Sequence, residues 1–150
     1  DLAVLLQMLL NGGMYRGHVY LYPETIQQFT RYYRPSESRR GLGFDKPSLN
    51  GPSPCGRLAS AESYGHSGFT GTFFWVDPQH QLLYIFLSNR VCPDAENNRL
   101  AAMNLRTDIQ DYVYQCLTSC AKKDLDKLSE DNEKSATFAR PAKRHRRHHH

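Results

Sequence analysis

The sequence predicts an α+β fold in which helices pack on an antiparallel sheet. Apolar residues recur at helical spacing near both ends of the folded part, over 2–10 and 97–117. Between them, residues 64–88 hold three short β-rich segments separated by turn-like sequences. Consecutive strands with short connections pair in antiparallel fashion, and helices flanking such a sheet define the α+β class.

Two helices are expected ahead of the sheet. Asp1 can cap a helix over 2–10, and Asn11-Gly12-Gly13 supplies the residues that end one. Pro23 suits the first position of a second, short helix. We expect this helix to fade near Arg34-Pro35, because proline forbids its continuation.

The pattern then changes from helical to extended. Gly41–Phe44 reads as a glycine-containing strand, and a loop rich in Pro, Ser and Gly follows from Lys46 to about Ala61. The three sheet strands are expected at Tyr64–Gly68, Thr72–Val76 and Gln81–Ser88.

The last two of these strands are joined by a turn-like tetrapeptide, Asp77-Pro78-Gln79-His80. Residues 82–87 are all apolar or aromatic, so both faces of a strand over these residues are apolar. A strand of this kind is covered on both faces, so we expect it to lie inside the sheet.

A helix from Asn97 to about Leu117 is expected to close the folded domain, residues 1–117. Its apolar stripe, which can pack on the sheet, contains Met103, Leu105, Ile109, Tyr112, Val113 and Cys116. Beyond it, residues 118–150 are charged and nearly free of aromatics, and we expect a disordered tail whose first residues can extend the helix. The whole net charge of +4 lies in this tail, because residues 1–117 hold ten basic and ten acidic residues.

Composition narrows the class of protein. Cys55, Cys92, Cys116 and Cys120 are not spaced like zinc or dithiol motifs. Cys116 and Cys120 are four residues apart and could meet, but scattered free thiols are the favoured interpretation. We expect no metal and no cofactor. No apolar run approaches the ~20 residues of a membrane span. The chain begins with Asp1 inside an apolar segment, from which we expect a fragment of a longer protein.

One segment carries a family resemblance. Ser63-Tyr64-Gly65-His66-Ser67-Gly68-Phe69-Thr70-Gly71-Thr72 resembles the third motif of the serine β-lactamase and penicillin-binding-protein superfamily, in its class C β-lactamase-related branch. Arg40–Phe44 and Phe74–Pro78 resemble the strands around that motif, and Ile85–Arg90 resembles the next one. The resemblance covers about residues 1–117 and implies the C-terminal part of a β-lactamase/transpeptidase-like domain.

The resemblance also implies roles for single residues. The backbone amide of Phe69 would be an oxyanion-hole donor, Gly68 would let the substrate approach, and Ser67 would bind a substrate carboxylate or carbonyl. His66 would supply positive charge or relay a proton as the catalytic residue of this chain. Asn89 is a candidate cleft residue, although a turn-forming role fits it better. The structural alternatives are that Gly68 and Gly71 only shape a bulge and a turn, and that His66 is a hydrogen-bonded strand histidine.

The nucleophile half of such a site is not found. The family's serine lies in a Ser-x-x-Lys motif assisted by Tyr-x-Asn or Ser-x-Asn. Here Ser119-Cys120-Ala121-Lys122 opens the charged tail and Ser48-Leu49-Asn50 lies in a proline-rich loop. We interpret the first as a chance match and the second as turn chemistry, and expect the chain alone to be inactive.

Three functions remain open at this stage. The leading hypothesis is a serine-hydrolase portion that acts on a peptidoglycan-like amide, a β-lactam or an ester, with the missing N-terminal half as its partner and a periplasmic or cell-envelope location. The alternative is a non-catalytic binding or scaffold domain of the same fold. Nucleic-acid binding by the basic residues of the tail is disfavoured, because no aromatics are interleaved with them and acidic residues occur in the same tail; these basic residues are Arg140, Lys143, Arg144, Arg146 and Arg147. The final histidines resemble a tag.

Overall fold

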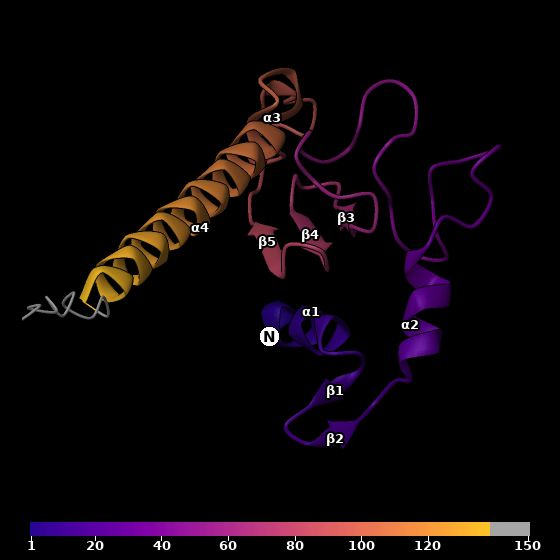
Figure 1. Ribbon diagram of the computed structural model, residues 1–150. Coiled ribbons are helices and arrows are strands. Elements are labelled where there is room, and N and C mark those ends of the chain that lie inside the picture. Colours follow the sequence, from indigo (N-terminus) through magenta and orange to yellow (C-terminus); the bar gives the residue numbers. More distant parts are fainter. Residues whose placement is uncertain (139–150) are drawn as a thin grey trace, which may run out of the picture. The chain divides into compact units, whose positions relative to one another are not determined.

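A computed structural model of the chain describes residues 1–138, with side chains described for residues 1–131 (Figure 1). Residues 1–114 form one compact unit and residues 115–150 belong to a second. The elements are α1 (Leu2–Leu10), β1 (Met14–Tyr15), β2 (His18–Val19), α2 (Pro23–Thr30), β3 (Tyr64–Ser67), β4 (Phe73–Asp77), β5 (Leu82–Phe86), α3 (Arg99–Ala102) and α4 (Leu105–Phe138). The α+β class and the antiparallel sheet are confirmed.

The helix α1 begins and ends as the sequence predicts. Asp1 stands at its N-cap, although its side chain makes no capping hydrogen bond. At the other end the Gly13 N–H donates to the Met8 carbonyl at 2.9 Å, and Gly13 has φ +92°. A Cβ at Gly13 would lie 2.0 Å from the Leu21 carbonyl oxygen, so only glycine fits there.

Two local predictions before the sheet need correction. The helix α2 starts at Pro23 but ends at Thr30, because Arg31 already has extended backbone angles. The strand expected over Gly41–Phe44 is wrong. The left-handed φ of +89° at Gly43 interrupts an extended course, and Asp45 then forms a single isolated bridge to Gly65.

The central sheet has the strand order β3-β4-β5, and Figure 1 shows the three strands side by side. The expectation that residues 82–87 lie inside the sheet is wrong for the described residues, since β4 is central and β5 is at the edge. The burial agrees, because Trp75 and Val76 of β4 are fully buried while most of β5 is only half-buried. The apolar residues on both faces of β5 thus reflect partial burial of each face, and not a central position of the strand in the sheet.

Each face of β4 carries its own core cluster, as strand alternation requires. On one face Phe73 and Trp75 stack with ring centroids 5.5 Å apart and pack with Cys55 and Tyr84. On the other face Val76 packs with Tyr64 and with Leu6 of α1. The helix α1 therefore covers one side of the sheet, and Val113 of α4 packs at the other.

The C-terminal helix differs from the prediction at both ends. Asn104, with φ +51°, separates α3 from α4 where one helix was expected. The helix α4 then continues to Phe138, well beyond the first residues of the expected tail, in keeping with the helix-forming Lys, Leu, Glu and Ala content of residues 118–138. Residues 139–150 of the expected tail lie outside the described residues.

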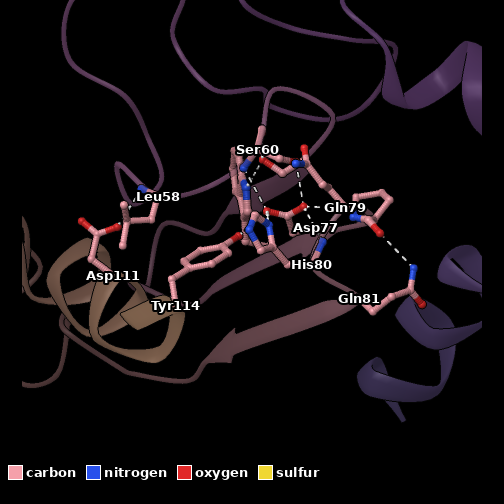
Figure 2. A network of polar contacts seen from close by, with 11 residues as sticks. Leu58, Ser60, Asp77, Gln79, His80, Gln81, Asp111 and Tyr114 are labelled. Carbon is pink, nitrogen blue, oxygen red and sulfur yellow. Dashed lines mark hydrogen bonds and ion pairs between the residues drawn. The ribbon is translucent and has the colours of Figure 1, made fainter. Parts of the chain in front are cut away.

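The carboxylate of Asp77 ties three segments together (Figure 2). It is fully buried and accepts six hydrogen bonds, which come from Ser60, Gln79, His80 and Tyr114. The Tyr114 hydroxyl is 2.6 Å away and comes from α4, while Ser60 comes from the long loop. Burial alone would raise the pKa of Asp77, but these hydrogen bonds outweigh it and hold the pKa below its ordinary value.

The network continues from Asp77 to the strand β3. Ser63 Oγ donates to the Ser60 carbonyl at 2.6 Å and accepts from the Trp75 indole N–H at 2.8 Å. Nearby, Asp111 accepts the N–H groups of Arg57 and Leu58. These bonds hold the long loop between the sheet and α4.

We predict that Asp77→Asn lowers the free energy of unfolding by roughly 2–4 kcal/mol. The neutral amide has only one acceptor oxygen, so it can replace only some of the hydrogen bonds that the carboxylate accepts from buried donors. The lowered folded-state pKa means that Asp77 stabilises the fold above the unfolded value of 3.8 and loses this contribution as the pH falls through the folded pKa. The variant should therefore show a flatter acid limb in urea melts. Asp124→Asn, at an exposed position of α4, is the matched control, and an equal loss in the two variants would contradict the prediction.

Candidate active site

The strand β3 presents the wall of the candidate site. Its register pairs Gly65 with Trp75, His66 with Phe74 and Ser67 with Phe73. A Cβ at Gly65 would lie 2.1 Å from the Phe74 carbonyl oxygen and 2.3 Å from the Trp75 ring. The glycine therefore allows the strand to lie directly against the core indole, and His66 and Ser67 begin the part that faces solvent.

A tight turn follows β3. The Gly68 N–H donates to the Thr72 carbonyl at 2.8 Å, and the Gly71 N–H donates to the Gly68 carbonyl at 3.0 Å. Gly71 has φ +92°, and a Cβ there would lie 2.6 Å from both Leu100 and Ser88 side chains. The turn-shaping alternative is thus correct for Gly71, while Gly68 both closes the turn and opens to solvent.

The structure brings three of the expected site residues together. His66, Ser67 and Gly68 line one cavity of about 230 Å³, whose other walls are Leu2, Thr72, Phe73, Phe74 and Leu87. The cavity is mostly apolar, so polar groups at its edge act in a medium less screened than water. Such a hollow beside a strand edge can accept a small acyl or peptide group.

The geometry of His66 fixes its neutral tautomer. Nδ1 lies 2.9 Å from the Ser67 carbonyl oxygen, which can only accept a hydrogen bond. Nδ1 therefore carries the proton, and Nε2 keeps a lone pair that can accept a proton from a bound group. No hydrogen-bond partner is recorded for Ser67 Oγ in the described part of the chain, so this exposed hydroxyl is available to a ligand.

Phe69 and Asn89 do not line this cavity. The Phe69 ring is 72% exposed, and within residues 1–138 no acceptor is recorded for its amide N–H. Asn89 is exposed and lines a separate hollow of about 280 Å³ next to α3. Its carbonyl accepts the Cys92 N–H at 3.4 Å, which agrees with the turn-forming interpretation.

Arg90 is a site-shaping residue to which sequence reasoning gave no role. Its guanidinium carbon lies 4.9 Å from the centroid of the Phe69 ring, and Nη1 donates to the carbonyls of Ala95 and Asn97 at 3.1 and 2.9 Å. Its backbone N–H also donates to the Thr70 carbonyl at 2.9 Å. Arg90 thus fastens the turn that carries the Phe69 amide to the loop after β5.

Two motifs match the family's nucleophile sequences only in their letters, Ser119-Cys120-Ala121-Lys122 and Ser48-Leu49-Asn50. Ser119 is exposed on α4, and its hydroxyl donates to the Gln115 carbonyl of the same helix at 2.9 Å. Ser48 Oγ donates to the Asn50 carbonyl at 3.0 Å within a bend. Neither arrangement resembles an activated nucleophile.

The remaining expectations concern metals, thiols and membranes. All four cysteines are free thiols. No group of three metal-binding side chains and no helix with the length and hydropathy of a membrane span occurs among residues 1–138. The terminal histidines and the basic cluster Lys143–Arg147 lie outside the described residues.

Comparison with known proteins decides the family. The family model described as Beta-lactamase matches residues 1–107, which include the strand β3 and its turn. The chain belongs to the beta-lactamase family. The predicted superfamily of serine β-lactamases and penicillin-binding proteins is thereby confirmed, and with it the assignment to serine hydrolases.

Two similar proteins from Salmonella carry the same name. A putative D-alanyl-D-alanine carboxypeptidase of Salmonella enteritidis is 41% identical over 92 residues, which are 60% of this chain and 21% of the relative. The protein of the same name in Salmonella newport is 42% identical over the same shares. This chain thus spans about a fifth of the length of the curated relatives it matches.

A solved structure shares the fold. The crystal structure of a beta-lactamase from Mycobacterium bovis aligns with a TM-score of 0.60 and 26% identity, over 79% of this chain and 43% of that protein. The β-lactamase-like architecture expected from the sequence is confirmed by this alignment.

We predict that Arg90→Ala speeds amide hydrogen exchange in the 68–72 turn and lowers the free energy of unfolding by about 1–3 kcal/mol, because two charge-assisted hydrogen bonds and a cation–π contact are lost. Exchange mass spectrometry on peptides spanning the turn measures the effect. Arg57→Ala removes an arginine that is 94% exposed and pairs only loosely with Asp111, at 3.7 Å, so it is the control. Unchanged exchange in the turn of Arg90→Ala would refute the fastening role.

Proposed function

We propose that this chain forms the substrate-binding and oxyanion-hole side of a serine hydrolase that transfers or hydrolyses an acyl group. The observation that carries the proposal is the edge of β3, where His66, Ser67 and Gly68 line a cavity and the Phe69 amide has no recorded acceptor in the described residues. The family membership supplies the reaction class, and the names of the Salmonella relatives favour a peptidoglycan-like D-alanyl amide as the substrate.

Each residue has a chemical task in this proposal. Acyl transfer places negative charge on the carbonyl oxygen, and a backbone N–H such as that of Phe69 stabilises it by about 3 kcal/mol. Ser67 Oγ donates to the substrate carboxylate or carbonyl, and Gly68 leaves room for its approach. Nε2 of His66, the nitrogen that does not contact the Ser67 carbonyl, exchanges a proton with the reacting group.

The nucleophile and its base are proposed to come from a segment outside these 150 residues. Support comes from Ser119, the serine of the sole Ser-x-x-Lys match, which is exposed on α4 and bonded to its own helix. Loss of a nucleophile with its base lowers turnover by roughly 10⁶, so we expect the chain alone to be silent. The same proposal includes a peptidoglycan-like substrate and a cell-envelope location for the whole protein.

The alternative function is a non-catalytic binding domain with the same wall. The exposed Ser67 hydroxyl and the apolar cavity favour ligand binding without requiring a nucleophile. The two functions differ in one measurable property, which is the formation of a covalent serine adduct.

We predict that the 150-residue chain gives no adduct with a fluorescent penicillin or a fluorophosphonate, whereas a longer product of the same gene that carries Ser-x-x-Lys upstream is labelled at that serine. Intact-mass and peptide mass spectrometry locate the adduct. Labelling of Ser67 or Ser119 in the short chain would contradict the assignment of roles. A longer product without any adduct would favour the binding-domain alternative.

The Phe69 amide can be tested separately in the longer product. Phe69→Pro removes the N–H, because proline has no amide hydrogen, and we expect the acylation rate to fall about 10²–10³-fold. Phe69→Ala keeps the N–H and controls for loss of the ring. A matching thermal melt shows that the fold is retained, and equal acylation rates in the two variants would place the oxyanion donor elsewhere.

A further inference from the structure

A second cavity of the 1–114 unit contains a buried lysine that the proposed function does not use. The cavity measures about 630 Å³ and is lined mainly by apolar or aromatic residues, among them Leu9, Leu10, Ile26, Tyr32 and Tyr64. Lys46 is part of this lining although its side chain is only 2% exposed. None of its lining residues is shared with the cavity beside His66.

The ammonium group of Lys46 is held by uncharged partners. Nζ donates to the Ser63 carbonyl at 2.8 Å and lies 5.0 Å from the centroid of the Tyr32 ring. These contacts orient the group, but neither neutralises its charge. No ion pair of Lys46 is recorded in the described part of the chain, and buried charges in proteins are ordinarily paired.

The buried carboxylates nearby are committed to other groups. The Asp45 carboxylate accepts two hydrogen bonds from the Arg39 guanidinium, at 2.8 and 3.1 Å. The oxygens of Asp77 are occupied by the donors of the network described above. The Glu62 carboxylate also lines the cavity and favours the charged form of Lys46, but no ion pair between the two is recorded among the described residues. The Lys46 ammonium therefore keeps donor capacity for a ligand.

We propose that this cavity binds a small organic carboxylate, with the carboxylate on the Lys46 ammonium and an apolar body against the α1 and α2 side chains. A cavity of about 630 Å³ is within the size of small-molecule sites, which combine apolar walls with a few placed polar groups. The Tyr32 hydroxyl donates to the Pro47 carbonyl at 2.8 Å, so the aromatic wall beside Nζ is held in place before binding.

The protonation of Lys46 gives the proposed binding a defined pH dependence. Desolvation lowers the pKa of Lys46 to about 8, although the carboxylates of Glu62 and Asp77 oppose the shift. A bound carboxylate favours the ammonium form and raises this pKa, so affinity is highest below about 8 and falls as the pH rises above it. The other titratable or charged groups that face the cavity or Nζ are Glu24, Arg31, Tyr32, Cys55 and Tyr64.

The test uses 4-phenylbutyrate as the carboxylate probe and 4-phenylbutan-1-ol as its neutral counterpart. Calorimetric titration of the 150-residue chain at about pH 7 should show the acid binding about 10- to 100-fold more tightly than the alcohol. At about pH 9 the acid should bind more weakly, and close to one proton should be taken up per ligand bound. This proton uptake is measured by repeating the titration in buffers of different ionisation enthalpy.

Three variants separate the lysine charge from the cavity. Lys46→Met should abolish the preference for the acid, Lys46→Arg should retain it and lose the pH dependence near 8, and Lys122→Met, at an exposed position of α4, should change nothing. If Lys46→Met does not fold, Lys46→Arg and the proton uptake of the unchanged chain decide. Equal affinities for acid and alcohol, or no binding of the acid at millimolar concentration, would overturn the proposal.

Discussion

The fold depends on keeping one buried carboxylate hydrogen-bonded. Asp77 at the end of β4 is out of contact with water, where an unpaired charge would cost several kcal/mol. Its donors come from the long loop, from the turn after β4 and from α4, so these three segments have to meet at one point. Ser63 extends the same network to the Trp75 indole and to the start of β3. The wall of the candidate site is thus positioned by an interaction at the opposite end of its strand.

Local patterns in the sequence were sufficient for most elements of the fold. The leucine spacing of α1, the proline that opens α2 and the turn sequence between β4 and β5 each act over a few residues. The Asp77 network could not be predicted, because Ser60 and Tyr114 are 17 and 37 residues away from it in sequence. The misassigned strand at 41–44 has the opposite cause, since a single glycine angle overrode a local pattern.

In the candidate site, too, local sequence patterns were predictable and tertiary contacts were not. The motif around His66 was visible in the sequence because its residue types and their order are specific, and His66, Ser67 and Gly68 do meet at one cavity. Arg90 was given no role because an arginine at the end of a strand carries no local signal. Its contacts with Phe69, Thr70 and Asn97 arise only when the loop after β5 folds back on the turn. The separation of Asn89 from this cavity has the same tertiary origin.

Gly65 has a consequence for how this wall can evolve. Any side chain at position 65 would collide with the Phe74 carbonyl and the Trp75 ring, so this position is closed to variation while the core keeps its indole. The next two residues are partly or fully exposed, so exchanges at 66 and 67 change the lining of the cavity without repacking the interior. Gly65 thus separates a fixed interior from a variable rim, and a new ligand preference can arise in this strand without loss of foldability.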